Sequence, residues 1–397
     1  MSRREDNTVP VVYHLVKMRL PFGQIWLKKV DAKVITPCHV SAFDVRPPHV
    51  CGAWHRLAIR KMEEKAMLKS TLGTLALVIG LAAPALAADV EPAVLYDSGG
   101  KFDKSFNELA YQGMEKFKKD TGVAYREFEV QNDAQREQAL RNFARHGNSP
   151  IIAIGFSQAT AVEKVAKEFP NLKFAIVDMV VNAPNVRSIV FKEQEGSYLV
   201  GLLAAKASKS GKVGFVGGMD IPLIRRFACG YVQGAKATNP SIEVFQNMTG
   251  TTASAWTDPV KGGELALSQI ERGADVIYHA AGATGIGVLQ KAAEKGKLGI
   301  GVDANQNYLF PGHVLTSMQK RVDIAVYNTA MDVKNGKWTA GIEALGLKEG
   351  GVTYAYDDFN KSLITPEMKT AVDAAKDEII SGKIQVHDYM SDNACPF

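Results

Sequence analysis

The sequence has 397 residues, of which 46% are hydrophobic and 22% are charged, with 35 glycines and 16 prolines. This composition excludes a wholly disordered, collagen-like or disulfide-dense chain, and the length favours two lobes over one core. The formal net charge of +5 comes from the N-terminal part, because residues 1–66 hold 12 Lys and Arg against 6 Asp and Glu. From Ala88 onward, 34 Lys and Arg stand against 36 Asp and Glu. The main part of the chain therefore lacks the basic surface that nucleic-acid binding requires, and we expect no nucleic-acid partner.

Residues 67–87 have the pattern of a secretory signal peptide. A positive start at Lys69 precedes an apolar run from Leu72 to Ala83, and small residues follow as far as Ala87. The apolar run is shorter than the roughly 20 residues of a membrane-spanning helix. We expect cleavage after Ala87, export to the periplasm and no lipid anchor, because no Cys follows the run. Residues 1–66 show no helical or strand period, and we interpret them as a non-native or untranslated upstream extension, with translation beginning at Met67 or Met62.

After Pro92 the hydrophobic pattern alternates between short β-rich runs and longer amphipathic stretches. In the first set we predict strands at 94–96, 126–130, 151–154, 173–177 and 187–191, and helices at 107–119, 134–145 and 158–169. Ser157 has the position of an N-cap for the last of these helices. In the second set we predict strands at 212–216, 242–245, 275–278 and 298–302, and helices at 195–207, 223–237, 260–272 and 285–295. Two further helices are predicted at 320–335 and 366–381.

Each connection between predicted strands is long enough for a helical crossover, so the sheets should be mostly parallel. The pattern predicts an α/β protein with two doubly wound lobes joined by a multi-strand hinge. We assign residues 91–190 and 305–350 to lobe 1, and residues 191–304 and 351–397 to lobe 2. In such sheets ligands bind beyond the carboxyl ends of the strands, so polar and aromatic residues there are site candidates.

Aromatic, acidic, basic and amide side chains gather at or just after these predicted strand ends. They are Asp97, Phe106, Asn107, Asp178, Trp256, Asp303 and Lys320. An aromatic side chain on each side of a slot suits a flat heterocycle, since stacking contributes about 1–3 kcal/mol per base. Carboxylates beside the slot accept hydrogen bonds from sugar hydroxyls or ring N–H groups.

The run from Asp97 to Asn107, D-x-G-G-x-x-D-K-S-F-N, resembles the opening motif of the basic membrane protein family of ABC-transporter substrate-binding proteins. Within this family the likeness is to the purine nucleoside receptors. The resemblance continues through the segments at 155–156, 175–178, 195–201, 256–259, 281–285, 301–303 and 320–321. It therefore covers nearly the whole chain after the signal peptide and none of residues 1–66.

The resemblance implies a type I periplasmic-binding-protein-like fold, whose two lobes close on a purine nucleoside or base and deliver it to a membrane permease. It implies that Phe106 and Trp256 stack on the base, with Trp256 standing where relatives usually have Phe. Asp97 and Asp178 match positions that contact the base or the first-lobe side of the ligand. The expected ribose contacts are Gly282, Asp303 and Lys320, and the matching segments add Asn107 and Phe156. We expect a monomer without catalytic activity, cofactor or metal.

Two questions stay open at this stage. Cys229 and Cys395 could form a disulfide in an oxidising compartment, or remain a buried thiol and a free one. A sugar or signalling-molecule receptor of the same fold is the first alternative function. A periplasmic nucleoside hydrolase is less favoured, because Asp97 and Asp103 supply too few ligands for a catalytic metal.

Overall fold

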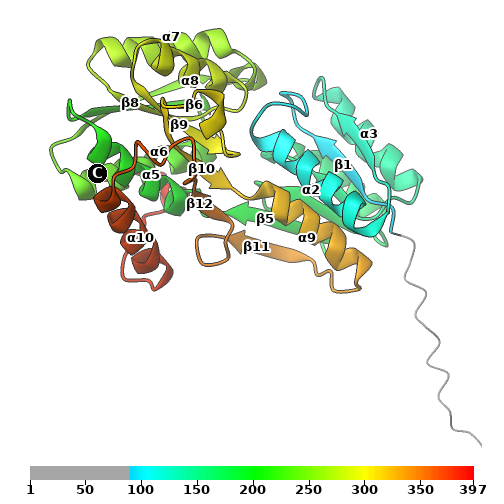
Figure 1. Ribbon diagram of the computed structural model, residues 1–397. Helices are drawn as coiled ribbons and strands as arrows, with labels where there is room; N and C mark the ends of the chain where they lie inside the picture. Colours follow the sequence, from blue (N-terminus) through cyan, green and yellow to red (C-terminus); the bar gives the residue numbers. More distant parts are fainter. Residues whose placement is uncertain (1–89) are drawn as a thin grey trace, which may run out of the picture. The chain divides into compact units, whose positions relative to one another are not determined.

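The computed structural model describes residues 90–397. The expected upstream extension, 1–66, and the expected signal peptide, 67–87, lie outside the described residues. Within 90–397 the chain forms two six-stranded sheets with helices packed against both faces (Figure 1). The predicted α/β fold with two doubly wound lobes is confirmed.

The first sheet has the strand order β11-β5-β4-β3-β1-β2, and every pairing in it is parallel. Its strands are β1 Ala93–Tyr96, β2 Arg126–Glu129, β3 Ile151–Ala153, β4 Phe174–Val177, β5 Val186–Phe191 and β11 Gly341–Leu345. Its helices are α2 Phe106–Thr121, α3 Ala134–Arg145, α4 Ala159–Glu168 and α9 Val322–Lys334. Side chains alternate along β1, so that Val94 and Tyr96 share a core with α2 and α9, whereas Leu95 packs with α3 and α4.

The second sheet has the order β12-β10-β9-β8-β6-β7 and is parallel except for β12, which pairs antiparallel with β10. Its strands are β6 Lys212–Met219, β7 Glu243–Gly250, β8 Val276–Ala280, β9 Leu298–Asp303, β10 Val314–Lys320 and β12 Val352–Tyr354. The helices are α5 Glu193–Ala207, α6 Pro222–Thr238, α7 Pro259–Glu271, α8 Thr284–Glu294 and α10 Pro366–Ile380. The first two share a core with one face of the sheet, and α7 and α8 pack on the other.

The strands β10, β11 and β12 are absent from the sequence-based prediction. Because β10 pairs with β9, residues 314–320 belong to the second sheet, although the sequence placed all of 305–350 in lobe 1. The predicted helix 320–335 begins only at Val322, because Lys320 ends β10. Nearly every side chain of β10 is buried and several are polar, so the strand lacks both an alternating and an all-apolar pattern.

The chain passes between the two sheets three times, after β5, after β10 and after β11. Hydrogen bonds join these crossings: the Lys192 amide donates to the Leu345 carbonyl at 3.0 Å, and the Arg321 amide donates to the Gly351 carbonyl at 2.8 Å. Helices α2 and α9, which are far apart in the sequence, lie side by side on the first sheet (Figure 1). Over residues 90–397, no helix is long and apolar enough to cross a membrane.

Candidate functional site

One cavity between the two sheets is lined by all nine residues that the sequence suggested as ligand contacts. Its empty space, including the opening to solvent, is about 640 Å³, within the range of small-molecule sites. The nine residues are Asp97, Phe106, Asn107, Phe156, Asp178, Trp256, Gly282, Asp303 and Lys320. Three further lining residues lie on α6 and are apolar, so the search for polar and aromatic residues at strand ends missed them: Leu223, Ile224 and Phe227.

The carboxyl ends of the strands place the polar residues at the cavity. Asp97 follows β1, Asp178 follows β4, and Asp303 and Lys320 end β9 and β10. Asp178 and Asp303 have φ angles of 71° and 60°, in the left-handed region that Asp tolerates better than most residues. The backbone therefore turns sharply at the two positions where a carboxylate meets the cavity.

The carboxylate of Asp97 is held by groups from its own lobe. Its Oδ1 accepts hydrogen bonds from the Arg136 guanidinium at 2.9 Å and from the Ser98 amide at 2.8 Å. Its Oδ2 accepts from the Ser157 hydroxyl at 2.7 Å. The prediction that Ser157 caps the following helix is wrong, because α4 begins at Ala159 without a side-chain cap and the hydroxyl binds Asp97 instead. Gly155 has a φ of 102°, and a Cβ there would collide with the Asp97 carboxylate.

Asn107 and Asp103 shape the loop between β1 and α2. The Asn107 side-chain oxygen accepts from the Asp97 amide at 3.0 Å, and its amide nitrogen donates to Asp103 at 3.3 Å. Asp103 also accepts backbone N–H groups of Ser105, Asn107 and Glu108, and so satisfies the first turn of α2. Burial raises the pKa of Asp103 to about 6, although these N–H groups oppose the shift. Both side chains hold the loop against the cavity.

Lys320 is the buried cation of the site. Its ammonium lies 2.7 Å from Asp178 Oδ2 and 2.9 Å from Glu193 Oε1, and the second contact is an ion pair without hydrogen-bond alignment. The rings of Phe106 and Phe227 lie 5.1 and 5.5 Å from the same nitrogen. Burial alone would lower the pKa of Lys320, but the surrounding carboxylates outweigh it and raise that pKa above its usual value. Lys320 is therefore charged at any physiological pH.

Burial also raises the pKa of Asp178 to about 6, with Lys320 opposing the shift. The second oxygen of Asp178, Oδ1, is buried and has no hydrogen-bond partner among residues 90–397. The cavity thus contains an acceptor that a ligand N–H or O–H group can satisfy. Glu193, which sequence reasoning missed, begins α5 directly after the first crossing between the sheets and has no exposed surface.

The two lobes contact each other directly at the cavity. The Ser105 hydroxyl, just before α2, donates to Asp303 Oδ2 at 2.6 Å. Burial raises the pKa of Asp303 to about 6, and Lys320 and Ser105 oppose the shift. The Gln306 amide nitrogen donates to the Lys104 carbonyl at 3.0 Å. Both hydrogen bonds join the loop before α2 to residues at or after the end of β9, so they exist only when the lobes are together.

Trp256 ends a short 3₁₀ helix, Ala253–Trp256, and its indole packs closely on the backbone of the second lobe. A Cβ at Gly218 would collide with the indole ring, and a Cβ at Gly282 would lie 3.6 Å from the Trp256 carbonyl oxygen. Glycine at position 218 therefore leaves room for the large aromatic side chain, whereas a Cβ at position 282 would be at ordinary contact distance. Among residues 90–397, no group of three His, Cys, Asp or Glu is placed to hold a metal ion.

Comparison with known proteins identifies the family. Residues 90–389 match the family model of PnrA-like ABC transporter substrate-binding proteins. The chain belongs to this family. The resemblance inferred from the motif after β1 is confirmed, and the protein is a substrate-binding protein of an ABC transporter.

Individual relatives agree with this assignment. The ABC transporter nucleoside-binding protein BmpA of Lactococcus lactis is 35% identical over 321 residues, which cover 75% of this chain and 89% of that protein. The CD4+ T-cell-stimulating antigen of Listeria monocytogenes is 35% identical over 323 residues, 75% of this chain and 88% of that protein. A solved ABC transporter solute-binding protein from Aeropyrum pernix superposes with a TM-score of 0.69 at 31% identity, covering 75% of this chain and 93% of that one.

Proposed function

We propose that this protein binds a purine nucleoside, or the free purine base, between its lobes and delivers it to the membrane permease of an ABC importer. The observation that carries the proposal is the cavity lined by aromatic side chains from both lobes, among them Phe106 and Trp256, together with buried carboxylates. Two aromatic walls suit a flat base, and carboxylates suit the hydroxyl and N–H donors of a nucleoside. The name of the Lactococcus lactis relative, a nucleoside-binding protein, supports the same ligand class.

The charge of the cavity favours nucleosides over nucleotides. Four carboxylates line it, those of Asp97, Asp103, Asp178 and Asp303, against the single ammonium of Lys320. That ammonium is already paired with Asp178 and Glu193, so no free cation among these lining residues is available for a phosphate. A neutral ligand rich in donors avoids the repulsion that a phosphate would meet.

Ligand binding then acts by lobe closure. Because Phe106 and Trp256 come from different lobes, a ligand touching both binds the closed form more tightly and shifts the population towards it. The proposal includes periplasmic location after cleavage behind Ala87, a monomeric receptor and no catalytic step.

A thermal-shift panel tests the ligand class. Purine and pyrimidine nucleosides, free bases, nucleoside monophosphates and monosaccharides are each added to the protein, and a ligand that binds only the folded state raises the melting temperature. We expect the largest shifts with purine nucleosides or bases, and none with the monophosphates. Shifts produced only by sugars would contradict the proposal and favour a sugar receptor on this fold.

A further inference from the structure

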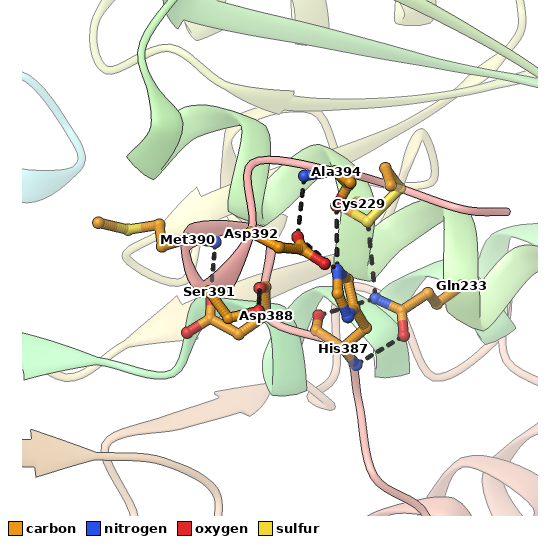
Figure 2. Close-up of a disulfide and its surroundings, with 9 residues drawn as sticks. Cys229, Gln233, His387, Asp388, Met390, Ser391, Asp392 and Ala394 are labelled. Carbon is orange, nitrogen blue, oxygen red and sulfur yellow. Dashed lines mark hydrogen bonds and ion pairs between the residues drawn. A yellow bond between two sulfur atoms is a disulfide. The ribbon is translucent and has the colours of Figure 1, made fainter.

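The C-terminal segment 386–397, here called the C-terminal strap, is fastened to α6. A disulfide joins Cys229 on α6 to Cys395 in the strap. One turn further along α6, the Gln233 side chain donates to the His387 carbonyl at 2.9 Å and accepts from the His387 amide at 2.8 Å. Figure 2 shows the disulfide with Gln233 and His387 beside it. The strap is therefore held at defined points and not merely laid over the helix.

Arg226, one turn before Cys229 on α6, connects the strap to the hinge. Its Nε and one terminal nitrogen donate to the two oxygens of Asp388 in the strap, at 2.8 and 2.9 Å. The other terminal nitrogen donates to the Phe191 carbonyl at 2.9 Å and to Glu193 Oε2 at 3.0 Å. The bidentate pair with Asp388 fixes the plane of the guanidinium, and this plane aims the remaining nitrogen at the first crossing between the sheets.

Glu193 carries the connection into the cavity. Its side chain is fully buried between two cations, with Oε2 on Arg226 and Oε1 at 2.9 Å from Lys320. Of the three N–H donors of Lys320, one bonds Asp178, and the ion pair with Glu193 occupies a second side of the ammonium, so a third donor remains for a ligand. The direction of that third donor depends on where Glu193 is held, and Glu193 is held by Arg226.

We propose that the C-terminal strap is a positioning element of the ligand site, in which Asp388 orients Arg226, Arg226 holds Glu193, and Glu193 sets the position of the Lys320 ammonium. The proposal rests on the proposed function and on the sequence-based expectation that Lys320 contacts the ribose of a nucleoside. Without the Asp388 carboxylate the guanidinium loses its bidentate partner, and Glu193 becomes its only carboxylate. Glu193 then moves towards Arg226 and away from Lys320.

The test compares two Asp→Asn substitutions in the same strap. Asp388→Asn removes the charge that pairs with Arg226. Asp392→Asn is the matched control, because within the described part of the chain the Asp392 side chain bonds only inside the strap, to the His387 ring and the Ala394 amide. Calorimetry measures the Kd of each variant for adenosine, guanosine and their free bases.

We expect Asp388→Asn to raise the Kd for the nucleosides about threefold to tenfold, while the Kd for the free bases stays at the wild-type value. Asp392→Asn should leave the Kd for the nucleosides and the Kd for the free bases at their wild-type values. Cys395→Ser frees the end of the strap, and it should likewise raise the Kd for the nucleosides but not the Kd for the free bases. The double variant should raise the Kd for the nucleosides by less than the product of the two single fold increases, because both substitutions act through Arg226.

If the strap only stabilised the second lobe, its loss would weaken the binding of nucleosides and of free bases by the same factor. Equal losses for both classes, or a wild-type nucleoside Kd in Asp388→Asn, would overturn the positioning role while leaving the proposed ligand class intact. A wild-type protein that binds the free bases but neither nucleoside would overturn the positioning role alone. A wild-type protein that binds neither the nucleosides nor the bases would overturn the proposed function as well.

Discussion

Ser105→Ala removes a direct hydrogen bond between the two lobes. The Ser105 hydroxyl and the Asp303 carboxylate are 2.6 Å apart, with relative exposures of 0% and 7%. A hydrogen bond to a charged group contributes about 1.5–3 kcal/mol. Because the bond forms only when the lobes meet, its loss lowers the closed-to-open ratio by about ten- to 150-fold. The apparent Kd rises by the same factor when the open form dominates without ligand.

Ser157→Ala is the matched control for this change. Its hydroxyl donates to the Asp97 carboxylate at 2.7 Å, but both residues belong to the first lobe, so the bond does not depend on closure. If the closed form is populated in the ligand-free wild type, small-angle X-ray scattering should show a larger radius of gyration for Ser105→Ala and the wild-type value for Ser157→Ala. Calorimetry then measures the Kd of Ser105→Ala for the ligand. If Ser105→Ala changes neither the radius nor the Kd, the bond to Asp303 does not hold the lobes together.

Three further predictions concern the ligand and pH. Trp256→Ala should weaken purine binding by about 1–3 kcal/mol in calorimetry, and native affinity would contradict its stacking role. Asp303→Asn should raise the Kd for nucleosides more than the Kd for free bases. Equal losses of affinity for the two would show that Asp303 does not contact the ribose. Because burial raises the pKa of Asp303 to about 6 and a ligand hydroxyl favours the ionised form, binding near pH 6 should release protons. Calorimetry in buffers of different ionisation enthalpy detects that release, and a binding heat independent of the buffer would count against it.

The buried carboxylates of Asp103 and Asp303 also determine how the free energy of unfolding depends on pH. The pKa values of Asp103 and Asp303 in the folded protein, about 6, exceed the ordinary Asp value of 3.8. The folded state therefore binds more protons than the unfolded state between these values, and this contribution to stability falls as pH rises from about 4 to 6. Thermal melts of the ligand-free protein across this range measure the effect. Asp303→Asn, which cannot titrate at this position, should reduce the slope, and an unchanged slope would refute the contribution of Asp303.

Much of the fold could be predicted because strand and helix alternate regularly after Pro92. The long connections made parallel sheets the only simple solution, and parallel sheets put functional side chains at the carboxyl ends of the strands. That rule selected Asp97, Asp178 and Asp303 from the many acidic residues of the chain, and all three line one cavity. Their roles as ligand contacts stay predictions until binding is measured.

The missing strands show where pattern reading fails. In β11, Gly341–Leu345, most side chains are exposed, so neither alternation nor an apolar run is present. In β10 the polar Thr316 and Ser317 are buried, and their hydroxyls bond to the Ala355 carbonyl and the Asn307 side chain. Such residues are strand residues because of distant partners, and a local pattern cannot reveal those partners.

Ser157 illustrates the same limit at the level of one side chain. A Ser before an amphipathic stretch is a common N-cap, and the local sequence supports no other interpretation. In the folded protein the Ser157 hydroxyl instead donates a hydrogen bond to the carboxylate of Asp97, 60 residues earlier in the chain. A tertiary charge-assisted bond displaces the local cap, because a buried carboxylate without donors is costly.

The buried charges around Lys320 are explained better by ligand binding than by stability. Asp178, Glu193 and Lys320 lie in a region of aromatic rings, where apolar side chains of similar volume are often as stabilising as a buried ion pair or more so. Asp178 Oδ1 moreover has no partner within the described protein, which adds a desolvation penalty that folding alone does not relieve. A polar ligand supplies the missing donor, and the stability given up in the ligand-free protein is then recovered as affinity.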